Sequence, residues 1–482
     1  MRVGPMTVTL LALVGMIFVA TIVIGSMPSS SVLSSAPQSP ALLFTVAKHY
    51  EPLAWLHGGD RFSSGATIFL QNEVQNNEVQ NKVQDKDASG RHPLVVGFAA
   101  SADPIVSFDG TSVLFAGKQK PSDHWQIWEV AVAKTASEPR RVTSCVDDCV
   151  RPFYLPDDRI VYAKKTDGRF VIEAASLTGD KIVQLTYGPG NFLPTDVLRD
   201  GRILFASSYP LGTNRAPEIY TVYSDGSGEE SYRCDHGKAR YSGRQIASGD
   251  IVFPSSSGSG SGSEFSLARF TSARAEQLHV AAPVGDYAGD IAETSSGEWL
   301  LAWRPDAKSF FQLKRWKPGS TSLLSVVTEP NANVIQPTLI VPRTVPKRHP
   351  SGLHDWPNAN LLCLNTYTSK YKFAAGSVRS VRMYTRDSVG TTKLLGSAPV
   401  ERDGSFFVQV PTEQPLQIEL LDNSGKTIKR QAGWFWMRRG EQRACVGCHA
   451  GPETAPENAV PMVLMKSTTP ADMTGHSAAG GH

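Results

Sequence analysis

Five residues near the end of the chain, Cys445-Val446-Gly447-Cys448-His449, form the pattern in this sequence that specifies a chemistry. Two thiols separated by two residues can each add to a vinyl group of haem, and the imidazole that follows can bind the iron as its proximal ligand. A CxxC zinc half-site and a redox-active dithiol are the alternatives, but tetrahedral zinc usually needs a second ligand pair, and none follows in the tail. The pattern therefore predicts one covalent haem c, attached through Cys445 and Cys448, with His449 on the iron.

The second axial ligand of the iron is less well specified by the sequence. Among the candidate distal ligands, Met462 is the first choice, because it follows a segment, residues 455–461, with the composition of an ordered loop. An iron with only five ligands is the prediction that we favour over any one of these candidates. Other side chains that could bind the iron lie on both sides of the motif: His354, Met437, Met465, Met473, His476 and His482.

The length of the tail limits how a haem can be covered. Only 33 residues follow His449, too few for the helical wrap of a free-standing class I cytochrome c. Other parts of the chain must therefore cover the haem. The aromatic stretch Trp434-Phe435-Trp436 could pack against a porphyrin edge, or it could belong to a protein core.

The N-terminus has the features of an export segment. Residues 6–24 form an apolar run of 19 residues that is interrupted only by Thr and Gly. This run is longer than a usual signal-peptide core of about 7–15 residues and close to the ~20 needed to span a bilayer. We expect an uncleaved signal anchor over residues 1–27 and a linker over 28–40, with a cleaved signal peptide as the alternative. Either one places the bulk of the chain in the periplasm or another extracytoplasmic space.

Composition describes an ordinary folded body after this segment. Hydrophobic residues make up 41% and charged residues 19%, and the net charge of +3 is too small to indicate nucleic-acid binding. The 41 glycines and 32 prolines suit many short strands joined by tight turns. A chain of 482 residues is expected to form more than one domain.

A short signature recurs through the first two thirds of the chain. Each copy has a turn with Asp or Gly, then two or three large β-forming residues, then a small residue. Counted from Ala116, where one copy ends, the next four copies end 47, 43, 48 and 48 residues after one another. A period of about 40–50 residues with this content predicts a β-propeller with one four-stranded blade per repeat. We expect it over residues 41–336, with six blades, or seven as the alternative. The copies, with a fainter one first, lie at residues 64–70, 108–116, 156–163, 199–206, 248–254 and 296–302.

These repeats resemble the TolB-type PD40 propeller repeat. The turn Pro156-Asp157-Asp158 and the turn Arg199-Asp200-Gly201, each followed by an apolar run, carry the resemblance best. It extends over about residues 95–305. Because propellers host many activities, the resemblance implies an architecture rather than a function.

A second β-domain is predicted after a linker over residues 337–355. Short strand candidates follow one another and are separated in places by turns such as Asp403-Gly404, which is typical of a small antiparallel sandwich. We place this haem-bearing domain at 356–462 and a disordered tail at 463–482. The predicted strands are residues 361–367, 378–384, 393–396, 405–410, 416–421 and 427–431.

The same region resembles the middle domain of the hydrazine synthase alpha-subunit family. The resemblance rests on Asp403-Gly404-Ser405-Phe406, Val410-Pro411, Leu421-Asp422, Gly440-Glu441 and the CVGCH pentad at 445–449. It implies a β-domain that delivers these cysteines to a haem, with a propeller before it. The chain has a single CxxCH and ends soon after it, so the resemblance implies haem attachment rather than hydrazine synthesis.

The remaining cysteines suggest further sites. Cys145 and Cys149 could form a small disulfide in an oxidising compartment, hold a metal with the intervening aspartates, or stay free; we favour the disulfide. Cys234 and His236 are a weaker metal candidate. Cys363 falls in a predicted strand and is expected to be a buried apolar residue.

The predicted protein is all-β: a membrane-anchored, exported, monohaem c-type protein with a propeller and a haem-bearing β-domain. Its expected role is electron transfer or small-molecule redox at the haem, with a redox partner protein or a small redox molecule and no nucleic acid. A binding, assembly or sensor module with a structural haem is the alternative. A haem-dependent oxidoreductase with an open iron position is the third hypothesis.

Overall fold

The computed structural model describes residues 40–72, 90–132, 138–208, 216–233, 237–256, 264–273, 276–387, 390–448, 454 and 458–475. The predicted anchor at 1–27 and nearly all of the linker to residue 40 lie outside these residues. Across the described ranges, no helix is long and apolar enough to cross a membrane. Within these ranges strands make up nearly all of the regular structure, and the exceptions are a 3₁₀ turn at Ala54–His57 and one short helix near the C-terminus.

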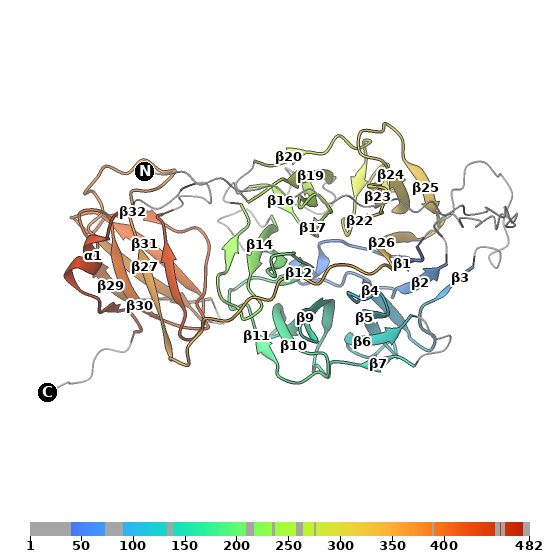
Figure 1. The fold of residues 1–482 in the computed structure, drawn as a ribbon, viewed down its shortest axis with the longest axis horizontal. Helices are drawn as coiled ribbons and strands as arrows, with labels where there is room; N and C mark the ends of the chain where they lie inside the picture. The colour runs from blue at the N-terminus through green and yellow to red at the C-terminus, as the bar shows by residue number, and fades with distance from the viewer. Residues whose placement is uncertain are drawn as a thin grey trace, which may run out of the picture. The chain divides into compact units, whose positions relative to one another are not determined.

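Six consecutive antiparallel sheets form the first part of the fold, which we call the propeller-like region (Figure 1). The first three sheets contain β26 (Asn333–Leu339), β1 (Leu42–Ala47), β2 (Thr67–Gln71) and β3 (Arg91–Pro93); β4 (Ala100–Val106), β5 (Ser112–Lys118), β6 (Gln126–Ala131) and β7 (Arg140–Arg141); and β8 (Cys149–Leu155), β9 (Arg159–Thr166), β10 (Arg169–Ser176) and β11 (Val183–Gln184).

The other three sheets repeat this plan. They contain β12 (Phe192–Val197), β13 (Ile203–Ser207), β14 (Glu218–Val222) and β15 (Glu230–Ser231); β16 (Ala239–Arg240), β17 (Arg244–Gln245), β18 (Ile251–Ser256), β19 (Ser266–Phe270) and β20 (Leu278–His279); and β21 (Asp286–Tyr287), β22 (Ala292–Glu293), β23 (Trp299–Arg304), β24 (Gln312–Trp316) and β25 (Leu324–Val327).

The repeat signature marks the same strand in five of the six sheets. Its apolar run forms β5, β9, β13, β18 and β23, each of which pairs with both neighbouring strands of its sheet and is largely buried. The fainter copy at 64–70 instead ends in β2, the third strand of its sheet rather than the second. This is because β26, from the far end of the region, supplies the innermost strand of the first sheet. There β26 pairs antiparallel with β1, in a register that joins Leu42 to Leu339 and Ala47 to Asn333.

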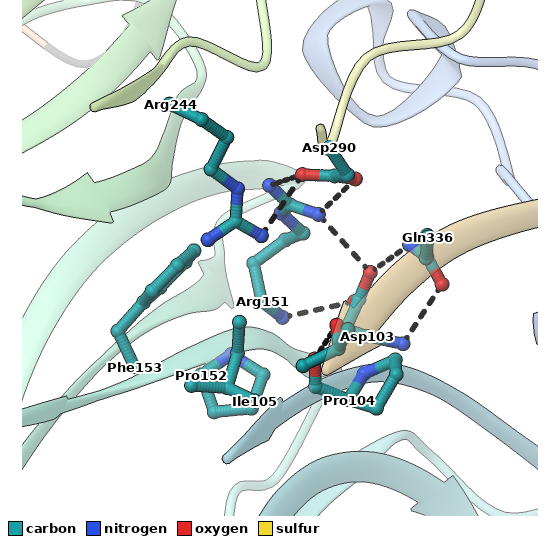
Figure 2. A pocket seen from close by; sticks show the side chains of 10 residues that line it. Asp103, Pro104, Ile105, Arg151, Pro152, Phe153, Arg244, Asp290 and Gln336 are labelled. Atoms are coloured by element: carbon teal, nitrogen blue, oxygen red, sulfur yellow. Dashed lines mark hydrogen bonds and ion pairs between the residues drawn. The ribbon is translucent and has the colours of Figure 1, made fainter. Parts of the chain in front are cut away.

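A polar network joins the innermost strands of the sheets (Figure 2). The Arg151 guanidinium forms two hydrogen bonds to Asp290, at 2.8 and 2.9 Å, and its Nε donates to the Pro194 carbonyl at 3.3 Å. Asp103 accepts from Gln336 Nε2 at 2.5 Å. Arg151 and both aspartates are almost fully buried, so the network holds strands from separate sheets together through charges that compensate one another.

Backbone geometry repeats with the same period at this network. Five residues on or beside the innermost strands have positive φ, between 48° and 57°, and are separated by 48, 91, 48 and 46 residues: Asp103, Arg151, Ser242, Asp290 and Gln336. At three of these residues, Asp103, Arg151 and Gln336, and again between Pro194 and Asp196 in β12, the strand pairing shifts register. Such a shift marks a β-bulge, in which one strand has an extra residue. A bulge bends the strand and changes the direction of a side chain. The repeat seen in the sequence is therefore also a repeat of bulged inner strands.

Two four-stranded sheets follow, and we call them the β-domain. One contains β33 (Gln442–Cys445), β27 (Asn358–Cys363), β30 (Phe406–Pro411) and β34 (Ala471–Asp472), and the other contains β29 (Thr392–Pro399), β28 (Ser380–Arg386), β31 (Leu416–Leu421) and β32 (Thr427–Arg430). Six of these eight strands match predicted ones. The two parallel edge strands, β33 and β34, were not predicted, because two- and four-residue strands with polar residues have no periodic signal.

The predicted disordered tail is wrong for the part of it that the structure describes. Residues Met462–Lys466 form helix α1, and β34 pairs with β30 through Val408 and Gln409. Met473 is fully buried in the core of the β-domain. A single apolar side chain among small and polar residues does not reveal this packing in the sequence, since the core that receives it is built by distant strands. Residues 476–482 lie outside the described ranges.

Candidate functional site

The CxxCH motif begins at the end of an edge strand. Strand β33 runs parallel to β27, and its last residue, Cys445, lies directly opposite Cys363. A tight turn leads into the strand: Gly440 has a φ of 66°, and a side chain there would collide with the His354 backbone. Glycine is therefore required for the entry to β33. His449 lies outside the described residues, so its predicted role at the iron stays a prediction.

Both cysteines of the motif are free thiols at half-buried positions. Burial raises the pKa of Cys445, with the Arg443 guanidinium acting against it. Burial likewise raises the pKa of Cys448 to about 11, and the Lys429 ammonium opposes this shift. Both thiols are therefore protonated at neutral pH.

The turn between the two cysteines is packed against the backbone of a neighbouring loop. A Cβ at Gly447 would lie far inside van der Waals contact with the Thr368 carbonyl oxygen. Tyr367 and Phe373, from the same loop, pack on the core that Cys445 and Cys448 also touch. Two free thiols separated by two residues, with Tyr367 and Phe373 packed on the same core, are what covalent attachment of a haem needs from this part of the chain. The residues present are thus compatible with the predicted cofactor.

Met462, the predicted distal ligand, is the first residue of α1. Its backbone N–H donates to Asp403 Oδ2 at 2.7 Å, and the next N–H donates to Ser405 Oγ at 3.0 Å. These bonds tie the helix to the turn before β30, while the Met462 side chain is half-buried. Two other candidates, Met437 and Met473, are fully buried in the core of the β-domain. Ligation of the iron by Met462 stays a prediction.

The three aromatic residues before the motif are buried in two different hydrophobic cores. Trp434 and Trp436 are buried in the core of the propeller-like region, where the Trp436 ring meets Phe192 edge-on at a centroid distance of 5.6 Å. Phe435 points into the core of the β-domain and exchanges two backbone hydrogen bonds with Leu416. The stretch therefore fastens the segment that leads to Cys445 between the two parts of the fold.

A buried charged cluster lies beside this segment. Glu441 accepts hydrogen bonds from Arg443 Nε at 2.9 Å, from the Arg438 N–H at 2.8 Å and from the Gly228 N–H at 3.3 Å. Gly228 and its neighbour Glu229 belong to the turn between β14 and β15 of the propeller-like region. Glu229 is 9% exposed, and its burial raises the pKa of its carboxyl to about 8, although Arg443 acts against the shift. Sequence reasoning missed this cluster because its members lie more than two hundred residues apart.

The sequence predicted correctly that Cys363 is buried, but it did not predict which residues surround it. It is 4% exposed, and burial raises the pKa of its thiol, with smaller contributions from Cys445 and Cys448. Three thiols therefore lie around the end of β33. Among the described residues, the sulfur atoms of these cysteines do not form a group with all ligand atoms within 4.8 Å of one another. The zinc alternative thus lacks a ready-made set of thiol ligands.

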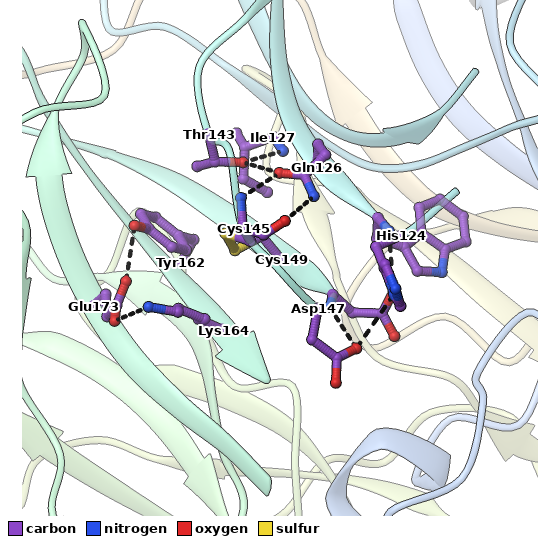
Figure 3. The surroundings of a disulfide bond; sticks show 12 residues. His124, Gln126, Ile127, Thr143, Cys145, Asp147, Cys149, Tyr162, Lys164 and Glu173 are labelled. Atoms are coloured by element: carbon purple, nitrogen blue, oxygen red, sulfur yellow. Dashed lines mark hydrogen bonds and ion pairs between the residues drawn. A yellow bond between two sulfur atoms is a disulfide. The ribbon is translucent and has the colours of Figure 1, made fainter. Parts of the chain in front are cut away.

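The favoured disulfide between Cys145 and Cys149 is present (Figure 3). Gln126 fixes the Cys145 backbone from both sides, by accepting from its N–H at 2.8 Å and donating to its carbonyl at 3.0 Å. In the same loop, His124 Nδ1 lies 3.4 and 3.6 Å from carboxylate oxygens of Asp147 and Asp148. These three residues could hold a metal, but the Lys165 ammonium, 3.9 and 4.0 Å away, already balances the two carboxylates. The other metal candidates, Cys234 and His236, lie outside the described residues.

Comparisons with known proteins agree with the predicted resemblance. Residues 364–450 match a family model described as the hydrazine synthase alpha subunit middle domain. The chain is also similar to the solved Kuenenia stuttgartiensis hydrazine synthase, with a TM-score of 0.74 and 17% identity over 89% of this chain and 72% of that one. At this identity the similarity shows a shared fold.

Two further solved structures have lower TM-scores. TolB from Acinetobacter baumannii has a TM-score of 0.42 and 12% identity over 64% of this chain and 67% of its own. A chain of a nidogen/laminin complex has a TM-score of 0.45 and 11% identity over 64% of this chain and all of its own. No curated protein matches the chain. The chain is therefore similar to the hydrazine synthase alpha subunit family through its middle-domain segment, residues 364–450, and shares its fold with a solved hydrazine synthase.

Proposed function

We propose that this chain is an exported, membrane-anchored, monohaem c-type protein that carries out electron transfer or small-molecule redox. The observation that supports it most is the position of the two free thiols of the CxxCH motif, at the end of β33 and inside the segment that matches the hydrazine synthase alpha middle domain. Haem bound there supplies a one-electron iron couple. The apolar run at residues 6–24 supports export and anchoring.

Different residues of the site have different roles in the proposed function. Cys445 and Cys448 bond to the haem, and His449 binds the iron as the proximal ligand. Met462 is the proposed distal ligand. Gly447 lets the motif lie against the Thr368 carbonyl, and the Glu441–Arg443 pair with the buried Trp436 holds the motif to the propeller-like region.

Spectra of the protein made with haem-maturation machinery test the proposal. Covalent haem should survive a denaturing gel in the wild type and disappear in a Cys445→Ala, Cys448→Ala double variant. The matched control, Cys145→Ala with Cys149→Ala, removes the disulfide in the propeller-like region and should keep the haem. Haem that persists in the first double variant would overturn the attachment.

The ligands of the iron are tested separately. His449→Ala should change the iron spectrum while leaving the thioether bonds possible. Met462→Ala should convert a low-spin reduced spectrum into one that responds to CO, whereas Met465→Ala, on the same helix with 73% of its surface exposed, should have no effect. A wild type that binds CO would instead place the chemistry at an open iron position and rule out Met462 as a tight ligand.

A further inference from the structure

We propose that Cys363 is a third redox-active thiol of the haem-attachment site, and that it forms a disulfide with Cys445 when no haem is attached. That bond makes Cys445 unavailable to a vinyl group, so it would control whether attachment can take place. The disulfide itself does not depend on the proposed function; only its consequence for haem attachment rests on it.

The pairing of the strands places the two cysteines side by side. In the parallel ladder of β27 and β33, Cys363 and Cys445 are direct partners, and the Leu364 N–H donates to the Cys445 carbonyl at 2.9 Å. Neighbouring strands lie about 4.8 Å apart. Disulfides join residues whose Cα atoms are about 4.4–6.8 Å apart. The Cα spacing expected for these paired residues therefore lies within the range that a disulfide spans.

The two side chains also share one face of the sheet. Cys363 is buried in the core of the β-domain, and Cys445 packs against that same core. Paired residues on adjacent strands point to the same side of the sheet. In addition, the thiol of Cys363 lies close enough to both motif cysteines for their charges to affect it. Cys448 is the only other described free thiol of the chain.

The bond can form in two ways, and both balance. An external disulfide takes two electrons and two protons from the thiols of Cys363 and Cys445, and is itself reduced to two thiols. Alternatively, Cys363 attacks Cys445 within a Cys445–Cys448 disulfide; the bond between those two breaks, and the proton of Cys363 passes to Cys448. Either route leaves Cys448 free and Cys445 blocked.

Peptide mapping of the haem-free protein tests this directly. The full chain, made without haem maturation, is equilibrated with oxidised and reduced glutathione, alkylated and digested with trypsin. Cys363 then lies in the peptide of residues 349–370, and both motif cysteines lie in residues 444–466. We expect these two peptides to be linked, with Cys448 alkylated and fragment ions that assign the bond to Cys445.

Controls separate this result from other thiol chemistry. Removing the other disulfide with Cys145→Ala and Cys149→Ala should leave the link intact. A Cys445–Cys448 bond at every glutathione ratio, or three alkylated thiols under oxidising conditions, would overturn the proposal. Both results come from the wild type, so they do not depend on the folding of a variant.

Haem attachment gives the functional readout. At a glutathione ratio that links half of the haem-free protein, Cys363→Ala should raise the fraction that accepts haem about twofold, because the competing thiol is gone. Under fully reducing conditions, the wild type and Cys363→Ala should load haem equally. If the link forms but Cys363→Ala changes nothing, the control of attachment is refuted. If neither protein ever takes up haem, it is the proposed function that fails.

Discussion

Replacing the buried carboxyl of Glu229 with an amide tests how the propeller-like region is docked on the segment that leads to Cys445. Burial raises the pKa of this carboxyl from 4.5 to about 8; the Arg443 guanidinium opposes the shift, and Glu230 and Glu441 add to it. Arg443 is already paired with Glu441 at 2.7 Å, so the Glu441 carboxylate largely neutralises the charge of its guanidinium. Glu229 is therefore protonated in the folded protein at neutral pH and ionised in the unfolded chain.

The magnitude follows from this difference in proton affinity. Between pH 4.5 and about 8 the folded state holds a proton that the unfolded chain has lost. Because the folded state binds more protons in this window, the free energy of unfolding falls as the pH rises through it. A tenfold difference in proton affinity corresponds to about 1.4 kcal/mol. The buried Glu229 carboxyl therefore lowers the free energy of unfolding by about 3 kcal/mol at pH 7 and by about 5 kcal/mol above pH 8. Glu229→Gln keeps the shape and should remove this cost.

Urea denaturation of the wild type and Glu229→Gln at acidic, neutral and alkaline pH measures the effect. The two proteins should be equally stable near pH 4, and Glu229→Gln should be the more stable one at pH 8.5. The matched control is Glu230→Gln, since that side chain is 61% exposed and forms an ion pair with Arg202; it should change stability by less than about 1 kcal/mol at any pH. Parallel pH profiles for the wild type and Glu229→Gln would refute the reasoning.

Three further substitutions test the packing around the site and the axis of the propeller-like region. Trp436→Ala should cost about 3–5 kcal/mol in urea denaturation, because a fully buried ring leaves a cavity. Asp290→Asn should cost a similar ~3–5 kcal/mol, since it removes the closer of the two carboxylates that pair with the buried Arg151 guanidinium and leaves only Asp103, 3.4 Å away; an unchanged midpoint would contradict the ion pair. Gly447→Ala should lower the yield of covalent haem without unfolding the domain, as judged by circular dichroism, because the new Cβ meets the Thr368 carbonyl.

Local patterns in the sequence determined a large part of this protein. The repeat signature located β5, β9, β13, β18 and β23, because a buried strand between turns carries its own composition. The pair Cys145 and Cys149 was readable because both cysteines lie in one short loop. The CxxCH motif was readable for the same reason: the thiols and the imidazole that the chemistry needs are consecutive along the chain.

Only the tertiary structure decided which distant residues meet. Cys363 faces Cys445 across 82 residues, since the register of β27 and β33 depends on how the whole sheet assembles. Glu229 reaches the Arg443 cluster, and Trp436 enters the core of the propeller-like region, through contacts that no periodicity records. A local pattern reflects the needs of a single strand or turn, whereas these contacts depend on the folded path of the chain, which one stretch of sequence does not encode.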